Sequence, residues 1–293
     1  MSTSSFAAVG SLSLHYLEWA GDGAADRPIV LVHGLGSSSH IWDLCAPDLA
    51  MHTRSRVVAL DQRGHGTSDQ PDEGYDFPSV VDDLRGLLDA IGVSEPALLV
   101  GHSWGASVVL HFAAAYPKRT AGIALVDGGT SSPGERWSWE EAETRLRPPD
   151  IDGLRWTDLH ERMARNNGGY VDPRAEAVGR SLFHIDDEGR ITRRFRIPNH
   201  MQVVRALWAQ RPADILGTLQ CPVLVLPARR PSDAEDYLAH KTASVQRVLD
   251  TVPRARARWF EDTVHDVPLQ RPAELALELS NFAAEVLPAG ARS

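Results

Sequence analysis

Five short, unbroken apolar runs constrain the fold of this chain more than any other feature of its sequence. A strand that is apolar at every position is expected where both faces of a sheet are covered, because a half-exposed strand alternates apolar with polar residues. Helical patterns lie between runs: residues 77–92 repeat apolar positions at helical spacing, and residues 106–116 read as a buried helix. Buried strands alternating with helices predict an α/β fold with a doubly wound, mostly parallel sheet. The runs are residues 29–33, 56–60, 97–101, 122–126 and 222–226.

This alternation lapses over residues 128–211, which hold four of the eight tryptophans and no clear parallel-sheet strand. A structureless loop of that length is improbable inside a compact domain. We therefore expect a helical insertion over one end of the sheet, here called the cap, within an α/β core of residues 1–127 and 212–293. The cap aromatics could line an apolar pocket or pack the cap itself. A group of cap arginines could attract an anionic substrate group, but the favoured prediction is a solvated face: Arg190, Arg193, Arg194 and Arg196.

The two ends of the chain are expected to complete the sheet and its cover. Residues 5–20 alternate loosely and predict an antiparallel hairpin. Residues 255–260 predict a last strand, and residues 272–286 a closing helix.

Composition excludes several classes of protein. The chain has 30 Lys+Arg against 39 Asp+Glu, a formal charge of −9, so it lacks the basic surface that nucleic-acid binding needs. Cys45 and Cys221 stand alone, which predicts buried free thiols and neither a disulfide nor a zinc site. The first residues lack the regions of a signal peptide, and nowhere do about 18 apolar residues run together. We expect a cytoplasmic protein without a membrane or nucleic-acid partner.

The segment Gly101-His-Ser-Trp-Gly105 is a G-x-S-x-G pattern, and its setting makes it informative. A buried strand precedes it and a helix follows it, which is the setting of a nucleophile elbow. Glycines permit a turn so tight that a side chain at either position would crowd the neighbouring strand and helix. Such an elbow lifts the Ser103 hydroxyl to the carboxyl edge of the sheet, at a helix amino terminus whose dipole favours negative charge.

A serine hydroxyl is a poor nucleophile until a base takes its proton, and His265 is the predicted base. It follows the last predicted strand, in a loop that can reach the same edge of the sheet. His33 and His102 lie inside motifs and are predicted to be structural.

Four motifs, taken in their order, resemble those of the α/β-hydrolase superfamily over about residues 12–287. The resemblance implies a capped serine hydrolase of the esterase or lactonase type with no metal and no organic cofactor. It also implies an oxyanion hole formed by the backbone N–H groups of Leu35 and Trp104, which would stabilise a tetrahedral intermediate. The segment 61–69 is predicted to be a charged turn that ties loops together. The motifs are His33-Gly-Leu-Gly36, Asp61-Gln-Arg-Gly-His-Gly-Thr-Ser-Asp69, Gly101-His-Ser-Trp-Gly105 and His265.

The acid that would orient His265 departs from the commonest pattern of that superfamily. The usual position, after the strand at 222–226, falls on or near Pro231, which has no carboxylate. Asp127 follows the preceding strand, the other site used in the family, and is our predicted acid. Asp233 is the main alternative, and Glu235 and Asp236 lie slightly beyond it.

These features predict a serine hydrolase that cleaves a small-molecule ester or lactone through an acyl-enzyme on Ser103. Haloalkane dehalogenases and epoxide hydrolases of the superfamily are disfavoured, because their nucleophile is an aspartate. One alternative keeps the fold and uses the same residues for cofactor-free carbon–carbon hydrolysis or oxygenation. Another is a non-catalytic, receptor-like ligand-binding protein. The acyl and alcohol groups accepted and the oligomeric state stay open at this point.

Overall fold

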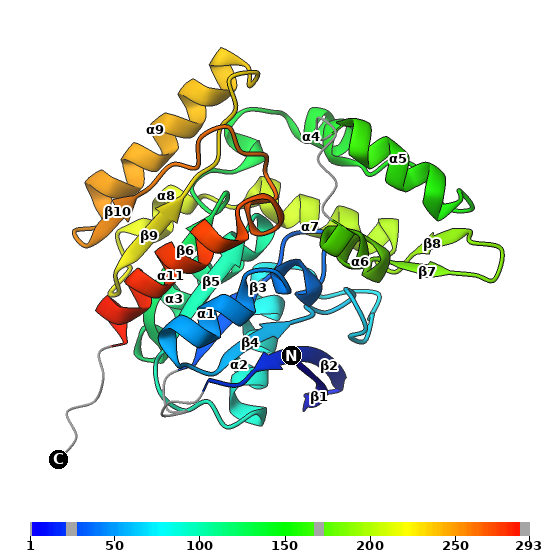
Figure 1. The fold of residues 1–293 in the computed structure, drawn as a ribbon. Helices are drawn as coiled ribbons and strands as arrows, with labels where there is room; N and C mark the ends of the chain where they lie inside the picture. Colours follow the sequence, from blue (N-terminus) through cyan, green and yellow to red (C-terminus); the bar gives the residue numbers. More distant parts are fainter. Residues whose placement is uncertain (1, 22–27, 167–172, 288–293) are drawn as a thin grey trace.

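Eight strands form one sheet in the computed structural model, which describes residues 2–21, 28–166 and 173–287 (Figure 1). The strands from β4 to β10 in sheet order are parallel, whereas β1 and β2 pair antiparallel with each other and β2 pairs antiparallel with β4. The doubly wound, mostly parallel sheet is therefore confirmed. In sheet order the strands are β1 (Thr3–Val9), β2 (Leu12–Trp19), β4 (Val57–Leu60), β3 (Ile29–Val32), β5 (Ala97–His102), β6 (Thr120–Val126), β9 (Val223–Leu226) and β10 (Ala255–Ala257).

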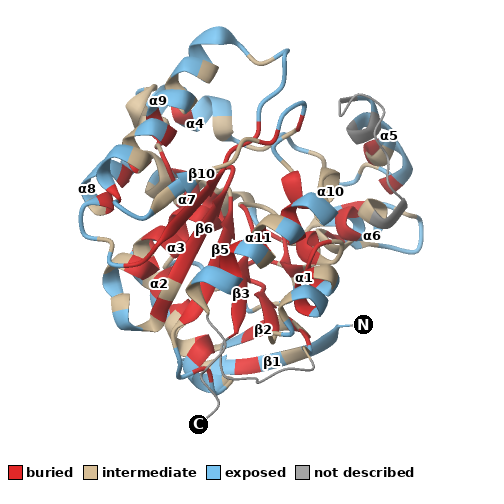
Figure 2. Cartoon of the chain, turned by 60° about the vertical axis from the view of Figure 1, so that its left-hand side comes forward, coloured by how far each residue is buried: buried red, intermediate tan, exposed pale blue. Residues whose placement is uncertain are grey.

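Both faces of the central strands are covered, which explains why nearly all of their residues are apolar (Figure 2). Alternate residues of one strand belong to different cores: Val30 and Val32 pack on one face of the sheet, and Ile29 and Leu31 on the other. A strand with two buried faces favours apolar residues, and the polar exceptions, Thr120 in β6 and His102 in β5, lie at strand ends.

Helices from distant parts of the sequence cover each face. Residues of α2 (Phe77–Ala90), α3 (Trp104–Ala115), α8 (Pro212–Leu216) and α9 (Glu235–Thr251) join the first core. Residues of α1 (Ala46–Thr53), α10 (Val267–Gln270) and α11 (Pro272–Val286) join the second. The helical patterns seen in the sequence correspond to α2, α3 and α11, whereas α1 and α9 were not expected from it.

The stretch between β6 and α8, predicted to be a helical cap, contains a hairpin as well as helices. It folds around a small core of its own, made by Trp156, Leu159, Phe183 and Ile191. The hairpin turns at Gly189, whose φ of 76° suits a glycine. The elements are α4 (Trp139–Leu146), α5 (Trp156–Asn166), α6 (Pro173–Ser181), β7 (Phe183–Ile185), β8 (Ile191–Arg193) and α7 (Ile197–Ala209).

Two further expectations concern cysteines and membranes. Cys45 and Cys221 are both buried free thiols, as predicted, and burial raises the pKa of Cys221 to about 11. Among the described helices, none combines the length and the apolar character needed to cross a bilayer.

Candidate active site

The chain turns sharply between β5 and α3, and Ser103 stands at the turn. Its backbone has φ 54° and ψ −116°, a strained conformation for a residue with a side chain. The turn is held by a hydrogen bond from the Ser103 amide to the carbonyl of Val126 at 2.9 Å and by one from the Ala106 amide to the Ser103 carbonyl at 3.1 Å. Ser103 is partly exposed at the amino end of α3, as the elbow interpretation requires.

Glycines allow three backbone segments to meet at this turn. A Cβ at Gly101 would overlap the carbonyl of Gly105, and one at Gly105 would overlap the carbonyl of Val32. A Cβ at Gly128 would overlap the Ser103 carbonyl as well. The strand ends of β3, β5 and β6 therefore converge on Ser103, and the third contact was not expected from the sequence.

Leu35 and Trp104, the predicted oxyanion donors, flank this turn. Trp104 is the first residue of α3, where a backbone N–H has no partner within the helix. In the described part of the chain neither the Leu35 amide nor the Trp104 amide donates a hydrogen bond. The loop that carries Leu35 lies against the elbow, since a Cβ at Gly34 would come within 3.1 Å of the Ser103 Cβ.

Two buried histidines hold the Leu35 loop. His33 bonds through Nδ1 to the Gly34 carbonyl at 2.7 Å and accepts at Nε2 from the Gln62 amide at 3.1 Å. His65 accepts at Nε2 from the Gly36 amide at 3.2 Å. Burial lowers the pKa of both imidazoles, which keeps them neutral and able to accept these bonds. His33 is thus structural, as predicted, and His65 is a loop-holding residue that the sequence did not single out.

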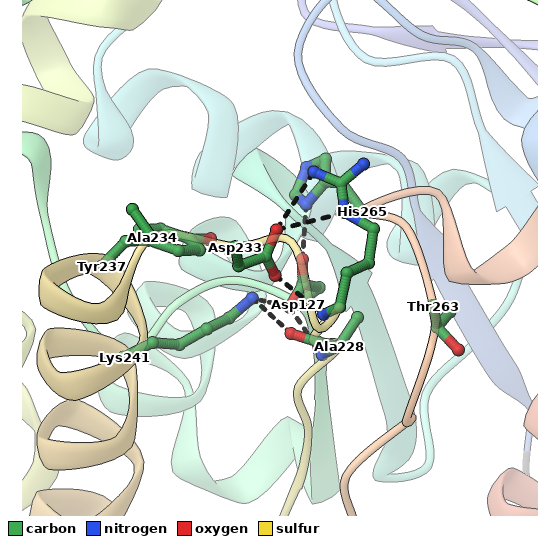
Figure 3. A pocket seen from close by; sticks show the side chains of 9 residues that line it. Asp127, Ala228, Asp233, Ala234, Tyr237, Lys241, Thr263 and His265 are labelled. Carbon is green, nitrogen blue, oxygen red and sulfur yellow. Dashed lines mark hydrogen bonds and ion pairs between the residues drawn. The ribbon is translucent and has the colours of Figure 1, made fainter. Parts of the chain in front are cut away.

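His265 and Asp127 meet at the same edge of the sheet (Figure 3). His265 Nδ1 lies 2.6 Å from Asp127 Oδ2. Asp127 directly follows β6 and is itself followed by Gly128, which packs against Ser103. His102, the residue before Ser103, bonds through Nε2 to the His265 carbonyl at 2.9 Å, so the His265 loop is tied to the elbow. The structure thereby brings His265, Asp127 and the Ser103 turn together.

The contact between His265 and Asp127 shifts their two pKa values in opposite directions. Desolvation alone would lower the pKa of His265, but the hydrogen bond and charge of Asp127 outweigh it and raise the pKa above its ordinary 6.5. Burial alone would raise the pKa of Asp127, but the hydrogen bond and charge of His265, with the charge of Lys241, hold it well below its usual range. Asp127 therefore stays ionised beside His265, whose pKa is raised and whose side chain is 52% exposed.

Asp233, the alternative acid, does not contact His265. Its carboxylate accepts from the Arg230 amide at 2.8 Å and pairs with the Arg230 guanidinium at 3.1 Å, which closes the turn after β9. Glu235 and Asp236 open α9, and Asp236 pairs with Arg136 at 2.8 Å. Asp127 is therefore the carboxylate that the fold delivers to His265.

Lys241 is a charged neighbour of this pair that the sequence did not reveal. It projects from α9, and its Nζ lies 2.6 Å from Asp127 Oδ1 (Figure 3). A cavity of about 300 Å³ opens beside the three side chains, lined also by Arg230, Asp233 and Tyr237. The motifs that predicted the oxyanion donors and the triad do not include Lys241. It lies on α9, a helix that was not expected from the sequence.

Two further groups of polar side chains were predicted from the sequence to be structural. The carboxylate of Asp61 accepts from the amides of Ser39 at 2.6 Å and Thr67 at 3.0 Å, so the segment 61–69 ties loops together as predicted. In the cap, the exposed Arg196 pairs with Asp72 at 2.8 Å and the exposed Arg190 with Glu188 at 3.1 Å. The Arg193 side chain is only 15% exposed and lies 3.7 Å from Asp152, so the prediction of one solvated face for all four arginines was wrong. In the part of the chain that the structure describes, no group of three or more His, Cys, Asp or Glu side chains could hold a metal ion.

Comparison with known proteins places these observations in a family. Residues 29–279 match the model of the alpha/beta hydrolase family. A haloalkane dehalogenase of Mesorhizobium japonicum is 36% identical over 151 residues, which is 51% of this chain and 47% of that protein. Epoxide hydrolase B of Mycobacterium tuberculosis is 42% identical over 97 residues, 32% of this chain and 27% of that protein. The chain thus spans half or less of the length of these curated relatives.

Solved structures match over nearly the whole chain. The crystal structure of an E-2-(acetamidomethylene)succinate hydrolase superposes with a TM-score of 0.75 at 20% identity, covering 96% of this chain and 99% of the other. A thioesterase domain from the curacin biosynthetic pathway gives a TM-score of 0.75 at 17% identity, covering 96% and 99%. At this level of identity the likeness shows the fold.

Proposed function

The chain belongs to the alpha/beta hydrolase family, and within it we propose that the protein is a serine hydrolase that cleaves a carboxylic ester or lactone through an acyl-enzyme on Ser103. The observation that carries the proposal is the hydrogen bond between His265 and Asp127 at the sheet edge that bears the strained Ser103 turn. A base oriented by a buried carboxylate beside an exposed serine is the arrangement that nucleophilic acyl transfer needs.

In the first half of the proposed reaction Ser103 Oγ attacks the carbonyl carbon. His265 Nε2 takes the hydroxyl proton as the C–O bond forms, and Asp127 stabilises the imidazolium through Nδ1. The Leu35 and Trp104 amides donate to the oxyanion, each contributing on the order of 3 kcal/mol to lowering the barrier. His265 then gives its proton to the leaving alcohol as the bond between the carbonyl carbon and the leaving oxygen breaks, which leaves Ser103 acylated.

In the second half water replaces the alcohol. His265 accepts a proton from water as its oxygen attacks the acyl carbon, and the same two amides receive the oxyanion. Collapse of the intermediate breaks the bond to Ser103 Oγ, which regains its proton from His265. Ser103 Oγ has no hydrogen-bond partner among the described residues, and such catalytic bonds commonly tighten only when substrate binds.

The nucleophile argues against a reaction like that named for the dehalogenase or epoxide hydrolase relatives. A carboxylate that displaces a halide or opens an epoxide forms an ester, which activated water can hydrolyse. A serine hydroxyl attacking the same carbon would form an ether, which a histidine base cannot cleave by hydrolysis. Attack on a carbonyl instead gives an ester on Ser103, so an acyl substrate suits this residue.

Covalent labelling tests the proposal. A fluorophosphonate probe should modify the wild-type protein on Ser103, and Ser103→Ala should prevent both the labelling and the hydrolysis of aryl esters. Screening esters of increasing acyl length together with lactones would then identify the preferred substrate class. Wild-type protein that stays unlabelled and turns over no ester or lactone would contradict the proposal.

The position of the acid favours one second candidate. Asp127 follows the earlier of the two strands, the position from which we expect the acid in some cofactor-free carbon–carbon hydrolases and oxygenases of this fold. In that oxygenase chemistry His265 would mainly deprotonate an enolisable ketone, so the reaction would survive Ser103→Ala. Comparing this variant on an ester and on an enolisable ketone in the presence of oxygen separates the two candidates.

A further inference from the structure

We propose that Lys241 is a positioning residue of the Asp127–His265 pair: its ammonium fixes one carboxylate oxygen of Asp127 so that the other faces the imidazole. The inference deepens the proposed function and rests on it for the catalytic meaning of His265. The contact itself is independent of the reaction.

The two oxygens of Asp127 have separate partners. Oδ1 lies 2.6 Å from Lys241 Nζ and accepts from the Ala228 amide at 2.8 Å. Oδ2 lies 2.6 Å from His265 Nδ1. The two donors to Oδ1 belong to other parts of the fold, Lys241 to α9 and the Ala228 amide to the segment after β9. The Asp127 carboxylate therefore cannot rotate without losing a charged partner.

Lys241 is itself held in place. Its Nζ donates to the Ala228 carbonyl at 2.7 Å and lies 5.2 Å from the centre of the Tyr237 ring. Lys241 continues the buried face of α9, on which Ser244, Val245 and Val248 follow at helical spacing. Its side chain is only 13% exposed, and a lysine there is costly unless its charge is paired.

The choice of residue type is informative in this chain. Only two of its 30 basic residues are lysines, Lys118 and Lys241, and the other 28 are arginines. An ammonium is a compact point charge that can approach one oxygen and one carbonyl together, whereas a guanidinium is a planar fork that suits bidentate pairs. The site beside Asp127 takes the less common residue because it needs the smaller group.

The charge of Lys241 also bears on the base. Burial alone would lower the pKa of Lys241, but the charge and hydrogen bond of Asp127 raise it, so the ammonium form persists. Its positive charge opposes protonation of His265 and thereby offsets part of the effect of Asp127. Besides Lys241, the charged and titratable groups around Asp127 and His265 are His102 on β5, Arg230 and Asp233 after β9, Tyr237 on α9, and Asp266 beside His265.

The test compares Lys241→Met, Lys241→Arg and Lys118→Met. Lys118→Met is the matched control, because it removes the only other lysine from an exposed turn. Rates are normalised to the fraction of protein that a fluorophosphonate labels, so a partly unfolded variant does not mimic a slow one. Loss of the charge should lower kcat by about tenfold to a hundredfold with little change in KM, the rate equivalent of one charge-assisted hydrogen bond.

The pH profile separates positioning from bulk stability. In Lys241→Met the acid limb of kcat/KM should move to higher pH, because the cation that opposes protonation of His265 is gone. Lys241→Arg should keep the wild-type limb and recover part of the rate, and Lys118→Met should behave as wild type. Lys241→Met with a wild-type kcat and an unmoved limb would overturn the proposal.

A measurement on the wild-type chain covers the cases in which Lys241→Met does not fold or no substrate is found. NMR spectra of protein labelled with ¹⁵N-lysine would contain the ammonium signals of Lys118 and Lys241. The signal that disappears in Lys118→Met belongs to Lys118, which assigns the other to Lys241. The Lys241 signal should shift with the same midpoint as the His265 ring, whereas the Lys118 signal should not. If the Lys241 signal does not change while the His265 ring titrates, the proposed link between Lys241 and the Asp127–His265 pair is refuted. If the fluorophosphonate does not label Ser103, only the proposed function is refuted.

Discussion

The array of Ser103, His265 and Asp127 has a counterpart at the antiparallel edge of the sheet, made of Ser4, His15 and Asp61. There the Ser4 Oγ lies 2.8 Å from His15 Nε2, and His15 Nδ1 lies 2.8 Å from Asp61 Oδ2. By its side chains alone this second set is the better connected of the two, since it includes the bond between serine and histidine.

The backbone around the two serines differs. Ser103 occupies a strained turn at the start of α3, next to two amides that donate to nothing in the described chain. Ser4 lies in β1, paired in a regular antiparallel ladder with Leu17 of β2. A nucleophilic serine needs donors aimed at the developing oxyanion as well as a base. We therefore expect catalysis at Ser103 and none at Ser4, although both serines belong to a set of the same three residue types.

The carboxylates differ as well. Asp61 is surrounded by neutral backbone donors from Ser39 and Thr67 in addition to His15, and it joins three segments of chain. Asp127 faces the cationic Lys241 and a histidine that is half exposed. We expect the array of Ser4, His15 and Asp61 to stabilise the fold and the array of Ser103, His265 and Asp127 to carry out chemistry.

The largest expected effect is at the two serines. Ser103→Ala should lower kcat for ester hydrolysis by at least about 10⁴-fold, because no other group can form the acyl-enzyme. Ser4→Ala should leave kcat within about twofold, since Ser4 has no oxyanion donors of its own. Steady-state assays on a reactive ester measure both, and an equal loss in the two variants would remove the distinction between the arrays.

Replacing each aspartate by asparagine should give opposite results. Asp127→Asn should lower kcat by about 10³ to 10⁴-fold, because an amide opposite Nδ1 favours the wrong tautomer of His265. Asp61→Asn should leave the activity of the folded protein nearly unchanged. It should lower the free energy of unfolding by about 2 to 4 kcal/mol, because it breaks a buried network of three donors. Urea unfolding and kcat measured on the same samples would show whether the two effects separate in this way.

Acid should inactivate the protein before it unfolds it. The pKa of His265 is raised above 6.5. The kcat/KM should therefore fall about tenfold for each pH unit below the pKa of His265, because the base becomes protonated. Burial alone would raise the pKa of Asp61, but the hydrogen bond from His15 and further donors lower it in the folded protein. The ionised Asp61 therefore stabilises the fold fully at any pH above its pKa in the unfolded chain. This stabilisation is lost as the pH falls from there through the lowered pKa of the folded state. Circular dichroism and activity at about pH 5.5 should therefore differ, with the fold intact and the rate low. A rate that stays flat from neutrality to about pH 5 would contradict a base role for His265.

The smallest effect is expected at Asp233. Asp233→Ala removes the acceptor that closes the turn with Arg230, so the free energy of unfolding should fall by about 1 kcal/mol. The kcat should stay within about threefold of wild type, because Asp127 holds His265. A loss comparable with that of Asp127→Asn would instead make Asp233 the acid.

The central strands and the elbow could be predicted because their signals are local. Residues 29–32 and 97–100 are apolar because both of their faces are buried, and the glycines at 101 and 105 are required by atoms only a few residues away or on the adjacent strand. The short hairpin of β7 and β8 and the helix α9 were missed. Their patterns are weaker, since β7 and β8 have three residues each and α9 is polar over most of its surface.

The sequence by itself determined the order of the strands along the chain, the turn at Ser103 and the two candidate positions for an acid. Only the tertiary structure showed that Asp127, and not Asp233, is bonded to His265, because that depends on which strand end reaches His265, 138 residues away from Asp127 in the chain. It also decided that Lys241 faces Asp127 and that Ser4, His15 and Asp61 form a second array. Contacts of this kind join residues that are distant in sequence, and no local periodicity encodes them.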